Sequence, residues 1–351
     1  MKYKIFGRRT GLRVAELALG AGNFGTGWGY GAAPEEARGI FERYAEAGGN
    51  FIDTADSYQF GQSEELVGQF IAAERDRFVL ASKYTLDSTA QSGISRLGNS
   101  RKNMVRSVED SLKRLKTDRI DLYWAHFSDE ATPVEEIARG FDDLVRAGKI
   151  VYAGLSNFPA WRIARAATLA ELRGWAPIAG IQIEYSLADR TADRELLPMA
   201  DALGLGATLW SPLGGGFLTG KYRAGTDGRL TGLKRLVHTE SDAHKTAILD
   251  AVLAIAKEVG ATSAQVAVAW LRKRAQSSTT AVVPIIGPRT REQLDDYLGA
   301  LAVTLTAEQE ARLTSVSAVR LGTPHEQIAA TASRIAGGDQ SRLDRGILPA
   351  A

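Results

Sequence analysis

Short runs of apolar residues recur along the chain, and stretches with apolar residues at helical spacing lie between them. Most of the runs are continuous rather than alternating, which is typical of parallel strands buried on both faces. Eight runs follow this pattern: residues 17–19, 51–53, 78–82, 120–124, 151–155, 181–184, 207–210 and 281–286. Eight strand–helix units predict an α/β fold, a (β/α)8 TIM barrel.

The segments between the runs carry helix-start signals. Pro34 and Pro133 come just before paired glutamates, and Ser63 comes just before Glu64 and Glu65. Acidic residues in a first turn face the positive end of the helix dipole, so we predict a helix at each place, with Ser63 as a cap. Apolar side chains then fall at helical spacing, as in Ile40, Phe41, Tyr44; Leu66, Val67, Phe70, Ile71; Val105, Val108, Leu112, Leu115; and Ile137, Phe141, Leu144, Val145.

A doubly wound sheet is the alternative architecture. Such a sheet normally carries a G-x-G-x-x-G fingerprint after its first strand. The first run here leads into residues 22–31, whose glycines have a different spacing. We therefore interpret these glycines as a mobile loop above a barrel.

Three segments lie outside the eight units: a predicted hairpin (residues 2–6 and 12–15), a long Gly-rich loop (214–243) and a tail (320–351). A loop that long in a compact domain is usually functional. The tail is interpreted as a lid or a frayed end. We predict one barrel domain over residues 1–351, with a core at about 16–305.

Composition removes several function classes. The 351 residues include no cysteine, so disulfide frameworks, zinc ribbons, iron–sulfur clusters and thiol nucleophiles are excluded. Lys and Arg number 43 against 41 Asp and Glu, and this near-neutral balance argues against nucleic-acid or membrane-surface partners. We find neither an 18-residue apolar span nor a signal peptide, and we expect a cytoplasmic protein.

Candidate chemistry lies where the predicted strands end, which is where barrel enzymes place catalytic groups. Asp53, Lys83 and His126 end the second, third and fourth strands, and Tyr58 follows shortly after the second. A phenol with a pKa of about 10 is a poor proton donor at neutral pH, and a nearby ammonium lowers that pKa. Each residue alone could be structural, but their joint placement suits carbonyl reduction, in which a proton reaches oxygen as hydride reaches carbon.

Two other chemistries fit less well. A metal hydrolase on a barrel would need several histidines at strand ends, and His126 alone is placed there. Residues 215–221 match G-x-x-x-x-G-K, but Tyr222 follows where a nucleotide-hydrolysing P-loop has Ser or Thr. The glycine amides and Lys221 still suit a bound phosphate.

Several motifs together resemble the aldo-keto reductases. They are FIDTADSY and GQSEELVG (residues 51–58 and 61–68), LASK (80–83), DLYWAH (121–126), GKIVYAGLSNF (148–158) and AQVAVAWL (264–271). Gln182 and residues 210–213 look closest to the branch that holds bacterial general reductases and potassium-channel β subunits.

This resemblance implies a role for each candidate residue. Tyr58 would be the general acid, Lys83 would lower its pKa, Asp53 would partner Lys83, and His126 would orient the carbonyl oxygen. The implied cofactor is NADPH/NADP, bound by Ser156, Asn157, Gln182, Trp210, Ser211, Leu213, Gly215, Lys221, Gly287, Arg289 and Gln293. Phe24, Trp28 and Phe127 would line the substrate pocket. Asp296 and Tyr297 depart from the Glu-Asn pair that the family usually places against adenine.

The implied function is an NADP(H)-dependent oxidoreductase that interconverts aldehydes or ketones and alcohols. The alternative is a nucleotide-binding redox sensor, or a channel-β-like binding protein, with negligible turnover. The expected partner is a small carbonyl or alcohol substrate, and a homo-oligomer is left open. We also expect the loop 214–243 to close over the dinucleotide.

Overall fold

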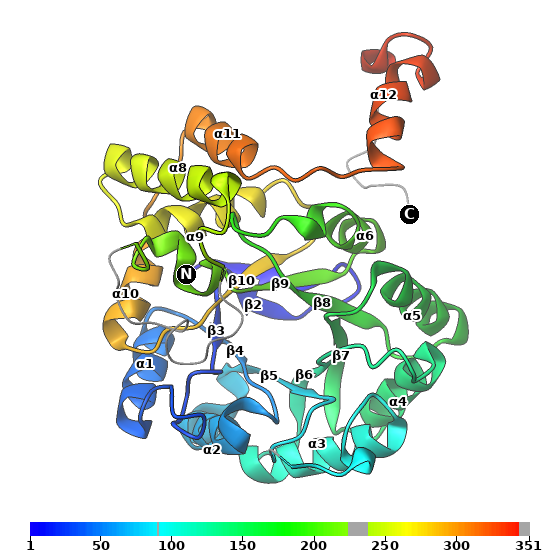
Figure 1. Cartoon of the computed structure of the whole chain (residues 1–351). Helices are drawn as coiled ribbons and strands as arrows, with labels where there is room; N and C mark the ends of the chain where they lie inside the picture. The colour runs from blue at the N-terminus through cyan, green and yellow to red at the C-terminus, as the bar shows by residue number, and fades with distance from the viewer. Residues whose placement is uncertain (90, 224–237, 344–351) are drawn as a thin grey trace.

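Eight parallel strands close into a barrel in the computed structural model, which describes residues 1–89, 91–223 and 238–343 (Figure 1). Their order around the barrel is β10-β3-β4-β5-β6-β7-β8-β9. The strands are β3 (Ala18–Gly20), β4 (Phe51–Asp53), β5 (Val79–Tyr84), β6 (Ile120–Ala125), β7 (Ile150–Ser156), β8 (Ile178–Glu184), β9 (Gly206–Trp210) and β10 (Val282–Ile286). The predicted TIM barrel is confirmed, and the doubly wound sheet is excluded.

Helices form an outer ring around this barrel (Figure 1). The helices of the described residues are α1 (Pro34–Glu46), α2 (Gln62–Ile71), α3 (Arg101–Leu115), α4 (Val134–Arg146), α5 (Ala160–Arg173), α6 (Leu196–Leu203), α8 (Ala243–Val259), α9 (Ser263–Arg274), α10 (Arg291–Gly299) and α11 (Ala307–Val316), together with α12 (His325–Ile335), which lies outside the ring. Two 3-10 turns matter for the site, η1 (Tyr58–Gly61) and η5 (Gly214–Thr219).

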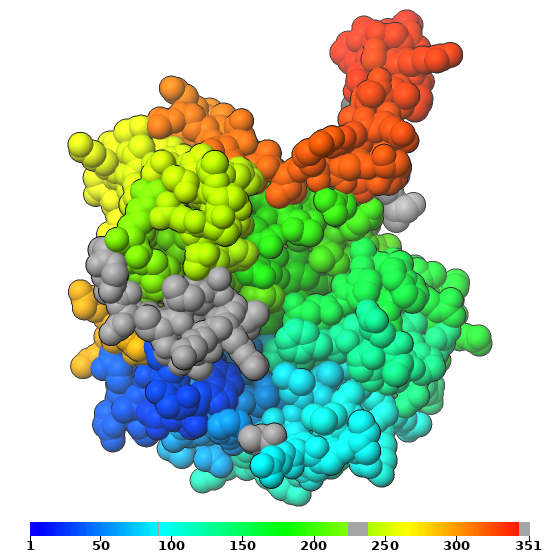
Figure 2. Space-filling model, in the orientation of Figure 1, coloured from blue at the N-terminus to red at the C-terminus, as the bar shows by residue number. Residues whose placement is uncertain are grey.

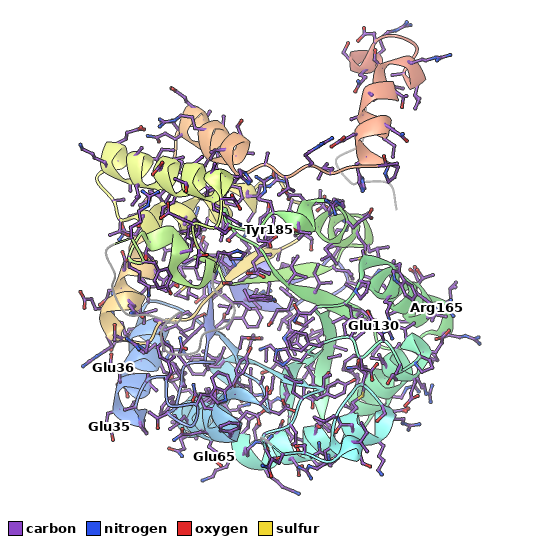
Figure 3. All side chains as sticks on the ribbon, viewed as in Figure 1. Glu35, Glu36, Glu65, Glu130, Arg165 and Tyr185 are labelled. Atoms are coloured by element: carbon purple, nitrogen blue, oxygen red, sulfur yellow. The ribbon has the colours of Figure 1, made fainter. Side chains whose placement is uncertain are left out.

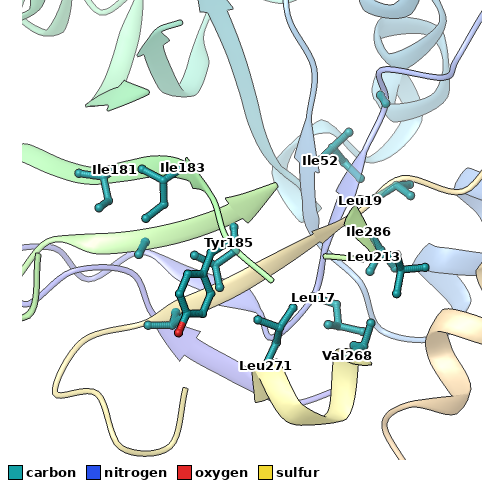
Figure 4. Close-up of a cluster of buried hydrophobic side chains, with 14 of the residues drawn as sticks. Leu17, Leu19, Ile52, Ile181, Ile183, Tyr185, Leu213, Val268, Leu271 and Ile286 are labelled. Carbon is teal, nitrogen blue, oxygen red and sulfur yellow. The ribbon is translucent and has the colours of Figure 1, made fainter. Parts of the chain in front are cut away.

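Alternation along the strands divides the core in two. Outward-facing side chains such as Ile52, Ile181 and Ile286 pack under the helices (Figure 4). Inward-facing side chains such as Phe51 and Trp124 fill the barrel interior. Because successive strand residues point to opposite faces, this alternation fixes which polar residues face the interior.

The N-terminal hairpin inserts a plug into the barrel. It pairs β1 (Tyr3–Ile5) with β2 (Arg13–Ala15) in antiparallel register, as predicted. The buried Phe6 ring meets Phe51 and Trp124 edge-on at centroid distances of 5.9 and 6.3 Å. A Cβ added at Gly180 or Gly206 would lie within 2.7 Å of the Phe6 ring, so only glycine fits at these positions.

The predicted start of α2 is wrong in detail. The N-cap is Gly61, with φ of 90°, and not Ser63. Ser63 instead points inward, and its Oγ donates to the carbonyl of Ala21 at 2.7 Å. Glu64 and Glu65 both lie in the first turn of α2 (Figure 3). Glu64 is fully buried and pairs with Arg114, whereas Glu65 is exposed. The sequence signal was that of a cap, but the serine satisfies a buried carbonyl.

The tail emerges beside the barrel. After α11, helix α12 stands clear of the ring of helices and contributes no buried side chain in the described part of the tail (Figure 2). Its role as a lid stays a prediction. Residues 224–237 of the predicted closing loop lie outside the described residues. Among the described residues, no single helix has the length and apolar character to cross a membrane; only α8 and α9 together do, with a 96° bend between them.

Candidate active site

Four polar side chains meet at one end of the barrel, three of them because of strand alternation. Asp53 and Lys83 lie on β4 and β5 in inward-facing positions, and His126 follows β6 in the same phase as the interior Trp124. Tyr58 reaches the same place from η1, the turn after β4. The structure therefore brings together the four residues to which the sequence analysis gave catalytic roles.

Lys83 is the centre of this group. Its buried ammonium donates to Asp53 Oδ2 at 2.5 Å, to the Thr54 carbonyl at 2.7 Å and to the Tyr58 hydroxyl at 3.2 Å. From the opposite wall, Gln182 Nε2 donates to Asp53 Oδ1 at 2.8 Å. Each oxygen of Asp53 therefore has a donor, and all three ammonium hydrogens have acceptors.

The electrostatics of this group follow from its burial. Burial lowers the pKa of Lys83, but the charge of Asp53 and the adjacent Tyr58 raise it by more, so the net pKa lies above its usual value. The ammonium lies 4.6 Å from the centre of the Tyr58 ring. A permanently charged ammonium beside the phenol oxygen stabilises the phenolate, which is what a phenol needs to act as an acid.

His126 lies next to Tyr58. The two rings meet edge-on with centroids 5.7 Å apart, and Phe127 stacks on the histidine at 4.6 Å. His126 is buried, and its Nδ1 has no hydrogen-bond partner among the described residues. Burial, and secondly the charge of Lys83, lower the pKa of His126 well below its usual value. The ring is therefore neutral at physiological pH.

A neutral His126 predicts the shape of a pH profile. The kcat/KM of a reaction at this site should show no loss attributable to histidine titration as pH falls through about 6.5. His126→Gln should lower the rate but leave the acid side of the profile unchanged in shape. Steady-state kinetics from about pH 5.5 to 8 measures this. A titration near the usual histidine pKa that disappears in His126→Gln would contradict it.

The residues assigned to the nicotinamide form a hydrogen-bonded row. Asn157 Nδ2 donates to the His126 carbonyl at 2.9 Å and to Ser156 Oγ at 3.0 Å, while Trp210 Nε1 donates to Asn157 Oδ1 at 3.1 Å. Asn157 and Ser211 have positive φ, 54° and 59°. These strained positions at strand ends fix the Trp210 ring and the amide beside His126.

The residues assigned to phosphates lie on η5. Gly214, Gly215 and Gly216 all have positive φ, a backbone conformation that residues other than glycine rarely adopt. The Gly215 amide donates to Ser211 Oγ at 3.0 Å. The Lys221 side chain packs against this run of glycines: a Cβ added at Gly216 would lie 2.8 Å from Lys221 Cε. Leu213 is buried below the turn.

The residues assigned to the adenosine half follow β10. The Gly287 carbonyl accepts from Asn23 Nδ2 at 2.9 Å, and Gln293 Oε1 accepts from the Arg289 amide at 2.9 Å. The Arg289 guanidinium lies 4.6 Å from the centre of the Tyr30 ring. Asp296, the departure noted in the sequence, accepts from Thr262 Oγ1 at 2.7 Å.

The three residues assigned to the substrate pocket are not equivalent. Trp28 meets the Tyr58 ring edge-on at 6.0 Å, and Phe127 is 41% exposed beside His126. Phe24 is fully buried and packs against Phe70 at 6.1 Å. In this structure, then, Phe24 belongs to the core and does not line an open pocket.

Sequence reasoning missed three features near the site. The Gln59 amide is buried behind Tyr58, and no motif indicated it. Glu184 and His238 share a hydrogen bond of 3.0 Å, with Asp189 close by, although the sequence placed this histidine away from the strand ends. Glu64, which the sequence analysis placed only in the first turn of a helix, accepts from Ser82 Oγ at 2.5 Å next to Lys83 on β5.

The arrangement fits a nicotinamide dinucleotide. An indole fixed beside the catalytic group, a left-handed glycine turn with a lysine, and a guanidinium near Tyr30 follow one another across the ends of β9 and β10. These groups suit a ring, a pyrophosphate and a phosphorylated ribose in that order. At the same site, His126 Nδ1 is a buried polar atom without a hydrogen-bond partner among the described residues.

The chain is similar to known oxidoreductases over most of its length. A model of the "Aldo/keto reductase family" matches residues 16–318. The chain is 39% identical over 317 residues to the "Uncharacterized oxidoreductase YrpG" of Bacillus subtilis, covering 88% of this chain and 93% of that one. It is 34% identical to the norsolorinic acid reductase of Aspergillus flavus over 332 residues (92% and 82%). It is 31% identical to the aryl-alcohol dehydrogenase GME11368 of Pestalotiopsis microspora over 333 residues (93% and 84%).

Proposed function

The chain belongs to the aldo/keto reductase family, and within it we propose that this protein is an NADP(H)-dependent reductase of aldehydes and ketones that also catalyses the reverse oxidation of alcohols. The observation that carries the proposal is the buried chain from Asp53 through Lys83 to the Tyr58 hydroxyl, with contacts of 2.5 and 3.2 Å. Such a chain supports proton transfer by a phenol and offers no strong nucleophile. It therefore favours oxidation and reduction over hydrolysis.

The proton path uses groups of this chain alone. The Tyr58 hydroxyl donates its proton to the carbonyl oxygen, and the Lys83 ammonium stabilises the phenolate that remains. Asp53 keeps the ammonium in place and charged. The neutral His126 ring lies beside Tyr58, and in this proposal it donates to the same carbonyl oxygen and so orients it. A bound NADPH would supply the hydride that reaches the carbonyl carbon.

Aromatic side chains around Tyr58 favour aromatic carbonyl substrates. Trp28 contacts the phenol ring, and Phe127, which stacks on the neighbouring His126, is 41% exposed. Offset or edge-on contacts between aromatic rings add to the stabilisation that comes from burying their area. The similarity to a relative named as an aryl-alcohol dehydrogenase supports the same substrate class.

The test is turnover on a carbonyl panel. NADPH binding is measured first by quenching of tryptophan fluorescence, and then loss of NADPH absorbance is followed with aryl, aliphatic and keto substrates. We expect turnover, fastest with aryl aldehydes. Binding of NADPH without turnover on any member of the panel would refute the enzyme and favour the nucleotide-binding sensor.

Cofactor preference gives a further prediction. The 2′-phosphate of NADPH carries charge that NADH lacks, and a guanidinium can hold it with two hydrogen bonds. We expect Arg289→Ala to weaken NADPH binding about 10- to 100-fold and to leave NADH binding nearly unchanged. Fluorescence titration with each cofactor measures both affinities.

Arg291 is the matched control. Its side chain packs against α1, where a Cβ added at Gly39 would be 2.8 Å from Arg291 Cδ. Its backbone amide donates to Glu36 Oε1 on the same helix. Arg291→Ala should leave both affinities unchanged. Equal wild-type affinity for NADH and NADPH would remove the basis for assigning Arg289 to the 2′-phosphate.

A further inference from the structure

The backbone directly after Tyr58 is strained. Gln59 and Phe60 have φ of 52° and 57°, and Gly61 follows with φ of 90°. Two consecutive non-glycine residues in the left-handed region persist only where other contacts hold them. Phe60 is 48% exposed, whereas Gln59 is 1% exposed. The buried residue of the two, Gln59, is therefore the one whose side chain can hold this turn.

The Gln59 side chain uses its whole amide group on one loop. Its Nε2 donates to the carbonyls of Gly22 at 3.1 Å and Tyr30 at 3.0 Å, and its Oε1 accepts from the Trp28 amide at 2.9 Å. This pattern fixes the orientation of the amide, since only the NH₂ group can serve two carbonyls. All three partners belong to the Gly-rich loop of residues 22–31.

The same loop packs on Tyr58 and on the turn. The Trp28 ring meets Tyr58 edge-on at 6.0 Å, and a Cβ added at Gly22 would lie 3.5 Å from the Tyr58 ring. A Cβ at Gly27 would lie 2.6 Å from the Gln59 carbonyl oxygen. The loop, the strained turn and the phenol are thus one packed unit, in which the buried amide is the polar link.

We propose that Gln59 is a positioning and specificity-determining residue, which holds the loop of residues 22–31, and with it the Trp28 ring, against the turn that carries Tyr58. The inference rests on the proposed carbonyl reduction. Through Gln59, the position of the Trp28 ring is linked to the turn that carries Tyr58. Substrates large enough to contact Trp28 depend on this link, and short aliphatic aldehydes do not.

Substitutions separate the side chain from the strain. Gln59→Gly relieves the left-handed backbone and removes the amide. Gln59→Glu keeps the size and the acceptor for the Trp28 amide but turns an oxygen toward the carbonyls of Gly22 and Tyr30. Gln69→Ala is the matched control, because Gln69 is an exposed glutamine nearby on α2.

The kinetic readout compares an aryl aldehyde, such as naphthaldehyde, with propanal. We expect Gln59→Gly and Gln59→Glu to lower kcat/KM for the aryl aldehyde about 10- to 100-fold, because the displaced Trp28 ring no longer holds the aryl group in place, and small misplacements of a reacting group have effects of that size. The values for propanal and the affinity for NADPH should change little. A uniform loss for both aldehydes would indicate a merely structural role and overturn the proposal.

Hydrogen exchange gives a readout that needs no turnover. Amides of residues 22–31 should exchange faster in Gln59→Gly than in the wild type or in Gln69→Ala, without NADPH present. Unchanged exchange, or unchanged discrimination between the two aldehydes, would overturn the proposal. A wild type without turnover would refute the carbonyl reductase, and exchange would then decide the coupling by itself. Gln59→Asn, which tolerates left-handed backbone, replaces Gln59→Gly if that variant does not fold.

Discussion

Replacing Tyr58 with phenylalanine should lower kcat for aldehyde reduction by about 10³-fold while NADPH affinity stays nearly unchanged. The substitution removes one oxygen, the atom that lies 3.2 Å from the Lys83 ammonium. The ring remains, so its contacts with Trp28 and His126 are kept. What is lost is the proton that must reach the carbonyl oxygen.

Single-turnover measurement of NADPH oxidation with the purified variant checks this expectation. Tyr3→Phe is the matched control, because Tyr3 lies on the N-terminal hairpin, away from the site. Its exposed hydroxyl donates to the Gly48 carbonyl. The control should retain wild-type kcat. A Tyr58→Phe enzyme with wild-type turnover would mean that another group donates the proton.

The barrel could be predicted because its pattern is local. Short continuous apolar runs identify strands without knowledge of their neighbours, and the strand ends then place Asp53, Lys83 and His126 at one end of the barrel. The inward direction of these side chains also follows from the two-residue period. What the pattern left open was the exact ends of the strands, such as the first, which lies at Ala18–Gly20.

The partners of the catalytic group could not be predicted, because they depend on long-range packing. Gln182 donates to Asp53 across 129 residues of sequence. The Gln59 backbone is left-handed although glutamine gives no such signal, since the cost is offset by three hydrogen bonds to a loop 29 to 37 residues away. Ser63 has the local sequence pattern of a helix cap. It does not act as one, because its hydroxyl donates to the buried Ala21 carbonyl instead.

The buried pair of Lys83 and Asp53 separates stability from catalysis. Lys83→Met leaves the Asp53 carboxylate buried with Gln182 as its one donor among the described residues, and breaking such a pair from one side costs about 3–5 kcal/mol. Turnover should also fall by about 10²- to 10⁴-fold, because the phenolate of Tyr58 loses its stabilising charge.

The double variant Asp53→Asn/Lys83→Met removes both charges, and replacing a whole buried pair is often neutral or stabilising. We expect denaturant unfolding at neutral pH to show most of the stability restored, while turnover stays as low as in Lys83→Met. Gln182 can still donate to the amide oxygen introduced at position 53, so the interior keeps one hydrogen bond across the barrel. A double variant as unstable as the single one would show that the pair stabilises the fold by more than mutual neutralisation. A double variant with recovered turnover would show that the phenol needs no ammonium beside it.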